Sequence, residues 1–490
     1  MTPAHVAREH RWRVLVVVFV VIVLLAAVVG TRGVSNPTSA AAPPASQVSA
    51  PNAESSSWYC TGRSTASGAA PGFIVLTNST GAPVAATVEQ ITDSGATATA
   101  AVSVPAFGDI SPILAAPSSG SWVSDLVTVE GGGVAASQVV DGSAGWSASP
   151  CQSTTSSAWY FASGSTVGAN TLNVSLLNPT STPVVVDLSF TTPSGVLHPI
   201  NDQGIVLNPS QVVVENVSAV VQNTAPVSTT VIARTGRVVA TELQQVSGSS
   251  NGISVVPGAN ATQARWVVPQ SQEVSQADTQ LDVFNPGSTA ESVTVHVHVA
   301  SGWLAPLTQT VAPESTWSLT TSAQTRIPVG AFYSAVVQAS GGGGVVVGRF
   351  VVAPSSSSSP QAGLAGAVDA ASTSPSSGEW VVPALGAATA LAVSGATVKS
   401  LAFTNTSGDD ERIYAFVIGS STDRHHLLVS GVLPPGGSQV LSGESVASIG
   451  LDPILVQSSG PMATSEDIGP AGMVGVVTMP ALPLDAPIGD

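Results

Sequence analysis

Five landmarks that recur four times in the same order are the feature that most constrains this chain of 490 residues. Each copy opens on a tryptophan, and an apolar run then ends on an asparagine in a turn. An alternating run, a proline and a glycine turn complete the copy. The tryptophans are Trp58, Trp159, Trp266 and Trp380, the asparagines are Asn78, Asn178, Asn285 and Asn405, and the prolines are Pro105, Pro209, Pro313 and Pro434. This order and its near-constant spacing predict four tandem domains.

Composition indicates that these domains are made of strands. Only 9% of the residues are charged, and the chain holds 35 prolines and 47 glycines. Short runs rich in Val, Ser and Thr that are separated by turn residues are typical of all-β proteins. Each copy holds six or seven such runs within about 85 to 100 residues, which is the size of a β-sandwich.

The landmarks and the composition shifts divide the chain. We expect a cytoplasmic N-terminus (1–13), a transmembrane helix (14–31), a Pro/Ala/Ser-rich stalk (32–56), and β-sandwich repeats at 57–152, 157–250, 263–354 and 378–480. A linker at 355–377 precedes the last repeat, and a Gly/Ser/Asn-rich joint at 247–261 separates the second from the third.

Residues 14–29 form an unbroken apolar run that Gly30 and Thr31 extend. A spanning helix needs about 17 to 25 apolar residues. Arg8, Arg11 and Arg13 precede the run, so the positive-inside rule places the N-terminus in the cytoplasm and the bulk of the chain outside. We favour a retained anchor because the run exceeds the short apolar core of a signal peptide. The alternative is secretion after cleavage near Ala42.

The first repeat contains both cysteines of the chain. Cys60 lies in the opening strand and Cys151 lies just past the last strand, so the pair brackets one domain. In an oxidising exterior, two cysteines placed in this way predict a disulfide.

The formal net charge of −16 argues against nucleic-acid binding, because phosphates would repel so acidic a chain. No P-loop, G-x-S-x-G, S-x-x-K or H-E-x-x-H pattern occurs. The glycine runs at 131–133 and 341–344 lie between valine-rich strands, which favours hairpin turns over phosphate loops.

The histidines were considered as metal ligands. His296 and His298 face one side of a predicted strand, where we expect them to meet solvent, and His425 and His426 lie in a polar turn. No cysteine or acidic cluster accompanies either pair. We therefore expect no catalytic residue, no cofactor and no metal, and hence no enzyme.

The second copy carries a resemblance to known proteins. Its segments read Trp-Tyr-Phe-Ala-Ser-Gly at 159–164, Asn-Pro-Thr at 178–180 and Val-Val-Ala-Thr-Glu at 238–242. They resemble a bacterial cell-surface repeat with a W-Y-F-A-E-G opening, an N-P turn and a valine-rich closing strand. The complete layout resembles an actinobacterial family of membrane-anchored exported proteins, domain of unknown function 5719. The resemblance implies immunoglobulin-like sandwiches and brings no catalytic residues. The third and fourth copies depart from it, since both open on Trp-Val-Val-Pro.

The expected function is that of a membrane-anchored, extracytoplasmic scaffold or spacer that interacts with other envelope proteins. The alternative is a carbohydrate-binding or adhesive surface protein that recognises wall polysaccharide. The two differ in whether aromatic side chains form an exposed flat row, for which the candidates are Trp303, Trp317, Trp122 and Tyr333. The sequence leaves open whether the domains form a rigid rod or a jointed chain.

Overall fold

The computed structural model describes residues 45–248, 251–273, 278–352, 362–366, 368–369, 378–385, 396–419, 426–446, 449, 452–470 and 477–485. The expected cytoplasmic N-terminus and transmembrane helix lie outside these residues, as does most of the stalk. Within the described ranges, no helix has the length and apolar character that crossing a membrane requires. The described residues belong to one compact unit, Pro44–Asp490.

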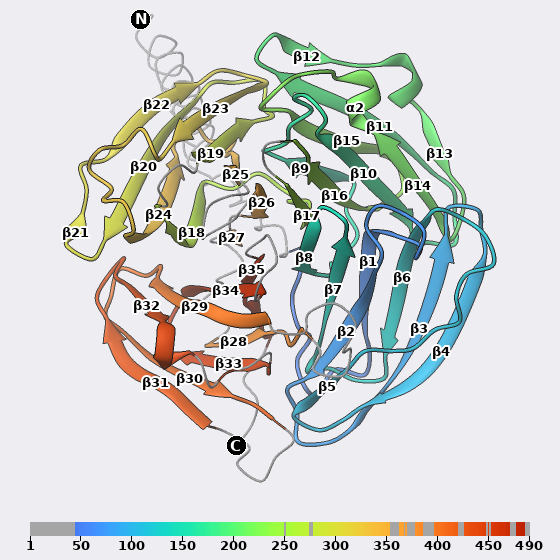
Figure 1. Cartoon of the computed structure of the whole chain (residues 1–490), viewed down its shortest axis with the longest axis horizontal. Helices are drawn as coiled ribbons and strands as arrows, with labels where there is room; N and C mark the ends of the chain where they lie inside the picture. The colour runs from blue at the N-terminus through green and yellow to red at the C-terminus, as the bar shows by residue number, and fades with distance from the viewer. Residues whose placement is uncertain are drawn as a thin grey trace, which may run out of the picture. The chain divides into compact units, whose positions relative to one another are not determined.

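The first copy folds into two antiparallel sheets that pack face to face (Figure 1, blue to teal). The sheet that contains the landmark tryptophan has the order β1 (Ser56–Ser64), β6 (Trp122–Val129), β3 (Val84–Thr92) and β4 (Thr97–Val104). The sheet that contains the landmark asparagine has the order β5 (Gly108–Ile110), β2 (Gly72–Asn78), β7 (Val134–Gly142) and β8 (Gly145–Pro150). We call these two kinds of sheet the Trp sheet and the Asn sheet.

The same two sheets recur in the other three copies. In the second copy the Trp sheet contains β9 (Ala158–Phe161), β15 (Ser228–Thr235), β11 (Val184–Thr192), β12 (Gly195–Leu197) and β13 (Ile205–Leu207). Its Asn sheet contains β14 (Gln211–Asn216), β10 (Thr171–Asn178), β16 (Val239–Val246) and β17 (Gly252–Pro257). A short helix, α2 (Val217–Val220), follows β14.

In the third copy the Trp sheet contains β27 (Val368–Asp369), β18 (Arg265–Gln272), β24 (Phe332–Ala339), β20 (Glu291–Val299), β21 (Gly302–Trp303) and β22 (Leu307–Val311). Its Asn sheet contains β23 (Ser315–Thr320), β19 (Asp278–Asn285), β25 (Val346–Val352) and β26 (Ala362–Gly366).

The fourth copy has β36 (Leu482–Pro483), β28 (Glu379–Val382), β33 (Ile454–Ser458), β30 (Glu411–Val417) and β31 (His426–Leu433) in its Trp sheet. Its Asn sheet contains β32 (Ser438–Ser442), β29 (Ala396–Asn405), β34 (Met462–Pro470) and β35 (Val477–Pro480). The expectation of an all-β protein with sandwich-like sheet pairs is therefore confirmed.

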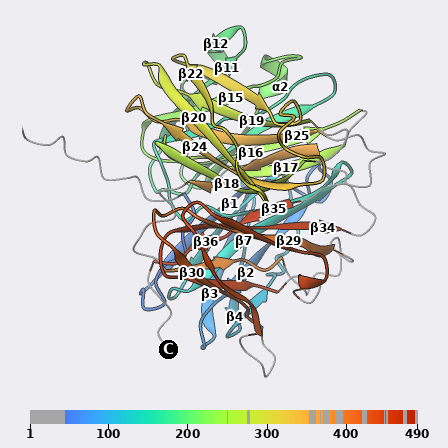
Figure 2. The ribbon, with the colours of Figure 1, turned by 90° about the vertical axis from the view of Figure 1, so that its left-hand side faces the viewer.

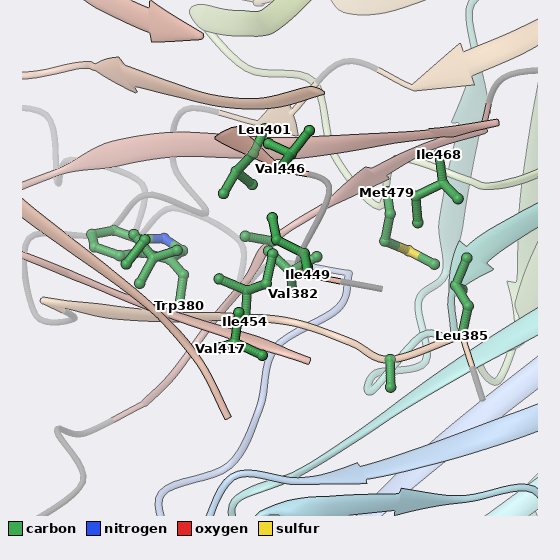
Figure 3. Close-up of a cluster of buried hydrophobic side chains, with 14 of the residues drawn as sticks. Trp380, Val382, Leu385, Leu401, Val417, Val446, Ile449, Ile454, Ile468 and Met479 are labelled. Atoms are coloured by element: carbon green, nitrogen blue, oxygen red, sulfur yellow. The ribbon is translucent and has the colours of Figure 1, made fainter. Parts of the chain in front are cut away.

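Alternation along the strands places a core between each pair of sheets. In β20, Val293, Val295 and Val297 are buried, whereas the intervening side chains are exposed or half-buried. In the fourth sandwich the core includes Trp380, Leu401 and Ile454 (Figure 3). Because successive side chains of a strand point to opposite faces, each sheet has one apolar face that must be covered.

The sandwiches also contact one another. The Trp strands β1, β9 and β18 contact β16, β25 and β34 of the following sandwich. The fourth meets the first at Ala384, whose N–H donates to Thr77 Oγ1 (3.0 Å) and whose carbonyl accepts from Ser137 Oγ (3.2 Å). Trp146 of the first sandwich belongs to the same core cluster as Trp380. The four sandwiches therefore form a closed cycle of contacts and not an extended spacer, which corrects that part of the expectation.

The two ends of the described chain meet at this closure. Val48 forms a parallel bridge with Leu484, and its N–H donates to the carbonyl of Pro483 (2.9 Å) while its carbonyl accepts from Asp485 (3.0 Å). Val48 is fully buried. The end of the expected stalk is thus part of the folded unit.

Two other segments that were expected to be flexible contain strands. The expected linker at 355–377 contains β26 and β27, which pair with β25 and β18. The expected joint at 247–261 contains β17, which pairs with β16, so the second sandwich runs past residue 250. Both segments supply an edge strand or sheet extension that the landmark pattern does not include.

The glycine runs do not form hairpins, contrary to the expectation. The turn at 131–133 connects β6 to β7, and the turn at 341–344 connects β24 to β25, so both cross from the Trp sheet to the Asn sheet. Gly133, Gly236 and Gly344 have φ of 72°, 75° and 72°, a conformation that favours glycine.

The predicted disulfide is present. Cys60 and Cys151 are bonded, with a Cα–Cα distance of 4.7 Å and a sequence separation of 91. Both are buried, so the bond joins β1 to the segment that follows β8.

Removal of this bond tests its contribution to stability. We expect the double variant Cys60→Ala/Cys151→Ala to unfold with a free energy lower by about 4 to 5 kcal/mol, because the bond restricts a long loop in the unfolded chain. Chemical denaturation of the oxidised protein and of the variant measures the difference. A reducing agent should destabilise the unmodified protein and leave the variant unchanged. Equal stability of the two proteins would contradict the prediction.

Candidate functional site

The landmark tryptophans are buried and link the two sheets of one sandwich. The indole Nε1–H donates to a backbone carbonyl at the start of the Asn-sheet strand that follows the glycine turn. The three bonds are Trp58 to Val134 (2.9 Å), Trp159 to Val238 (2.9 Å) and Trp266 to Val345 (2.7 Å). Trp380, also buried, lies in the core that Figure 3 shows. A buried indole needs such an acceptor, so its position is fixed by both packing and hydrogen bonding.

The landmark asparagines link the sheets at the same end of the sandwich. Asn178 donates to the carbonyls of Thr182 (2.8 Å) and Leu207 (3.0 Å), and its Oδ1 accepts from the N–H of Thr180 (2.9 Å). Leu207 ends an edge strand of the Trp sheet. Asn78, Asn285 and Asn405 make the equivalent bonds to Ala82 and Val104, Thr289 and Val311, and Asp409 and Leu433. All four are at most 1% exposed, so their amides serve the fold.

A buried polar side chain occupies one equivalent position in every Asn sheet. Each of these residues pairs with the residue four positions before the landmark asparagine. They are Gln138, Glu242, Arg349 and Glu466. All are at most 4% exposed. The five landmarks do not include this set, although aligning the four copies would place a polar residue at the same position of each valine-rich strand.

Two of these residues are carboxylic acids without a cationic partner at hydrogen-bond distance among the described residues. Burial raises the pKa of Glu242 well above its ordinary value, and the Thr229 hydroxyl, at 3.4 Å, offsets this only in part. Burial and the neighbouring Asp467 raise the pKa of Glu466 in the same direction. Burial therefore favours the neutral, protonated form of both acids.

A chain of polar contacts crosses from the third sandwich to the fourth. Arg349 donates to the carbonyl of Gln270 (2.8 Å) and to Thr478 Oγ1 (2.7 Å), and the Thr478 hydroxyl donates to Asp467 Oδ1 (2.6 Å). Burial raises the pKa of Asp467, and the positive charge of Arg349 offsets part of the rise. Arg349 and Asp467 are 4% and 7% exposed, so a substrate has no direct access to them.

Asp282 lies in β19 and accepts a hydrogen bond from Ser318 Oγ. Desolvation by burial raises its pKa from 3.8 to about 6, although that hydrogen bond lowers it in part. The carboxyl group therefore loses its proton just below neutral pH at the cost of burying a charge.

The histidines on β20 are half-buried and not fully in solvent. Trp303 lies edge-on to His296 and His298, with ring centroids 6.2 and 5.0 Å apart, and burial lowers the pKa of His298. His426 is exposed, and His425 lies outside the described residues. In the described ranges, no group of three or more His, Cys, Asp or Glu side chains is placed to hold a metal ion.

The candidate aromatic row does not form. Tyr333 is buried at 2% exposure. Trp303, Trp317 and Trp122 belong to three different sheets, in β21, β23 and β6. These side chains do not share one flat surface.

Substitution of a landmark asparagine tests its role in the fold. We expect Asn178→Ala to lower the free energy of unfolding by at least about 2 kcal/mol, because it leaves buried backbone groups without partners. Asn201→Ala, at an exposed position of the same sandwich, is the control and should change little. Urea denaturation measures both. A small effect of Asn178→Ala on the free energy of unfolding would contradict the role of Asn178 in linking the two sheets.

Asp282→Asn tests the effect of the buried acid on pH stability. A folded pKa of about 6 against 3.8 means that this group stabilises the protein most below about pH 4 and loses about 3 kcal/mol of that contribution as pH rises to about 6. Asparagine keeps an acceptor for Ser318 and does not titrate.

We therefore expect the variant to exceed the unmodified protein in stability at pH 7.5 and to match it more closely at pH 4. Denaturation at both values measures the difference, and the other buried acids cancel because both proteins contain them. If the free energies of unfolding of the two proteins differed by the same amount at pH 4 and pH 7.5, the prediction would be contradicted.

Comparisons with known proteins cover part of the chain. No curated protein matches it. Among solved structures, the Anabaena sensory rhodopsin transducer aligns with 18% of this chain and 95% of its own at 16% identity and a TM-score of 0.16. An α-L-rhamnosidase from Streptomyces avermitilis aligns with 82% of this chain and 55% of its own at 10% identity and a TM-score of 0.12.

A tetra-tandem repeat in the extending region of a large adhesion protein aligns with 90% of this chain and 99% of its own, at 13% identity and a TM-score of 0.10. Residues 131–322, which include the whole second sandwich, match the model of a family of unknown function, DUF5719. The function of this chain must therefore be argued from its own residues.

Proposed function

We propose that this chain is a non-enzymatic, extracytoplasmic protein of the cell envelope, held at the membrane by residues 14–31. The buried Cys60–Cys151 disulfide is the observation that carries the location. Structural disulfides persist in oxidising compartments and are rare in the cytosol. The basic residues before an apolar run give the same orientation, with the bulk of the chain outside.

The proposed role is that of a compact scaffold on which other envelope proteins dock. The recurrent polar and aromatic side chains support it, because the landmark tryptophans and asparagines bond to the chain's own backbone. The buried charged groups at Arg349 and Asp467 lie inside the folded unit. A compact unit of four sandwiches supplies surface and not length, so the spacer role is not part of the proposal. Glycan recognition by Trp303, Trp317, Trp122 and Tyr333 is also left out, since they do not share a face.

The location is tested in intact cells of a bacterial host that express the full chain. We expect the chain to be in the membrane fraction, to be digested by external protease, and to contain no free thiols after denaturation. A cytoplasmic marker protein that resists the protease is the control. Deletion of residues 14–31 should retain the chain in the cytoplasm with two free thiols. Protection of the unmodified chain from protease would contradict the proposal, and a mature chain in the medium that begins near Ala42 would replace the anchor with secretion.

The scaffold role is tested by cross-linking on the same cells. Discrete adducts of higher mass that contain envelope proteins are expected for the full chain. Their absence in cells where the chain is correctly located would contradict docking, and leave the location itself intact.

A further inference from the structure

One strand of each Trp sheet offers an internal comparison between the four sandwiches. In β3, β11, β20 and β30, buried residues alternate with three side chains on the outer face. Those outer positions hold Ala85, Thr87 and Glu89; Val185, Asp187 and Ser189; Ser292, Thr294 and His296; and Arg412, Tyr414 and Phe416. The fold therefore accepts small or polar residues where the fourth sandwich has two phenyl rings.

The two rings of the fourth sandwich lie side by side on the sheet surface. Tyr414 and Phe416 are two residues apart on β30, their ring centroids are 6.5 Å apart, and their planes differ by 15°. Tyr414 is 41% exposed and Phe416 is half-buried. In the third sandwich the corresponding ring, His296, packs edge-on against Trp303. Among these four strands, the near-parallel pair of rings occurs only in β30, which is labelled in the lower part of Figure 2.

Neighbouring strands extend this surface. On β31, Leu427 pairs with Phe416 and Val432 pairs with Arg412, and the two aliphatic side chains are 48% and 58% exposed. Gln457 of β33 pairs with Tyr414 on the other side. We call the set of Arg412, Tyr414, Phe416, Leu427, Val432 and Gln457 the aromatic face. Contiguous exposed apolar side chains of this kind, rimmed by polar ones, mark interaction sites.

We propose that the aromatic face binds a neutral polysaccharide. A sugar ring has an apolar C–H face, which packs on a flat aromatic ring, and a rim of hydroxyl groups, which bond to polar side chains. Tyr414 and Phe416 supply two nearly parallel rings, and Arg412 supplies donors at the margin. The Nε2 of Gln457, on the other side of Tyr414, donates to Glu379 Oε1 (2.7 Å). The net charge of −16 opposes polyanionic glycans, so the ligand is a neutral one.

This inference goes beyond the proposed scaffold role and does not depend on the membrane anchor. The aromatic face differs from the candidate row of Trp303, Trp317, Trp122 and Tyr333, none of which belongs to it. Two stacked rings on the outer face of a sheet also differ from the well-packed pocket that anchors a protein partner.

The test is a depletion assay with the purified full chain in detergent and insoluble cellulose, chitin and mannan as separate probes. We expect saturable binding to at least one of them. The double variant Tyr414→Thr/Phe416→His, which takes the residues of the third sandwich at these positions, should bind at least about tenfold more weakly. Tyr414→Phe keeps the ring and should retain binding within about twofold.

Two controls separate binding from folding. Thr87→Ala, at the position of the first sandwich that corresponds to Tyr414, should leave binding unchanged. The melting temperature of the double variant should match that of the unmodified protein, since three sandwiches fold without these rings. No binding to any probe, or equal binding by a folded double variant, would overturn the proposal. Loss of protein cross-links in that variant without any polysaccharide binding would assign the face to a protein partner and also overturn it.

Discussion

Each sandwich depends on satisfying the backbone groups where the chain passes from one sheet to the other. These groups are buried, and a buried carbonyl or N–H without a partner costs about 1 to 3 kcal/mol. One asparagine amide per sandwich bonds to the turn that it begins and to the end of an edge strand in the facing sheet. One indole, observed in the first three, bonds to the strand that leaves the glycine turn. The five landmarks therefore recur together because they meet at one end of the sandwich.

The contacts between sandwiches are of a different kind from those within them. Within a sandwich the core is mainly apolar, whereas the seams include hydroxyl pairs such as Ser228 with Thr316 (2.6 Å) and Ser334 with Ser438 (2.7 Å). The latter pair joins the third and fourth sandwiches. Hydroxyl pairs and the buried acids fix which surfaces meet, because a shifted seam would leave polar groups without partners.

The sequence predicts the features that recur in all four copies and does not predict the contacts that join one sandwich to another. The sandwich-like sheet pairs follow from recurrent landmarks and period-two alternation, and the Cys60–Cys151 bond follows from cysteine placement. The cycle of contacts does not follow, because it depends on residues such as Ala384 and Val48 that belong to no recurrent pattern.

The strands β17 and β26 were assigned to flexible segments because Gly and Ser reduce the apolar signal of an edge strand. The sequence of β30 alone does not mark the aromatic face, since Tyr414 and Phe416 fit the alternation of any half-buried strand.

The closure between the first and fourth sandwiches has a consequence for how the chain is made. Val75, Val139, Trp146 and Ala148 of the first sandwich belong to a cluster whose other buried members come from the fourth. During synthesis from the N-terminus, that apolar surface stays uncovered until residues beyond Trp380 have emerged. Until its last quarter has been made, the nascent chain is therefore prone to aggregate through the surface that the fourth sandwich later covers.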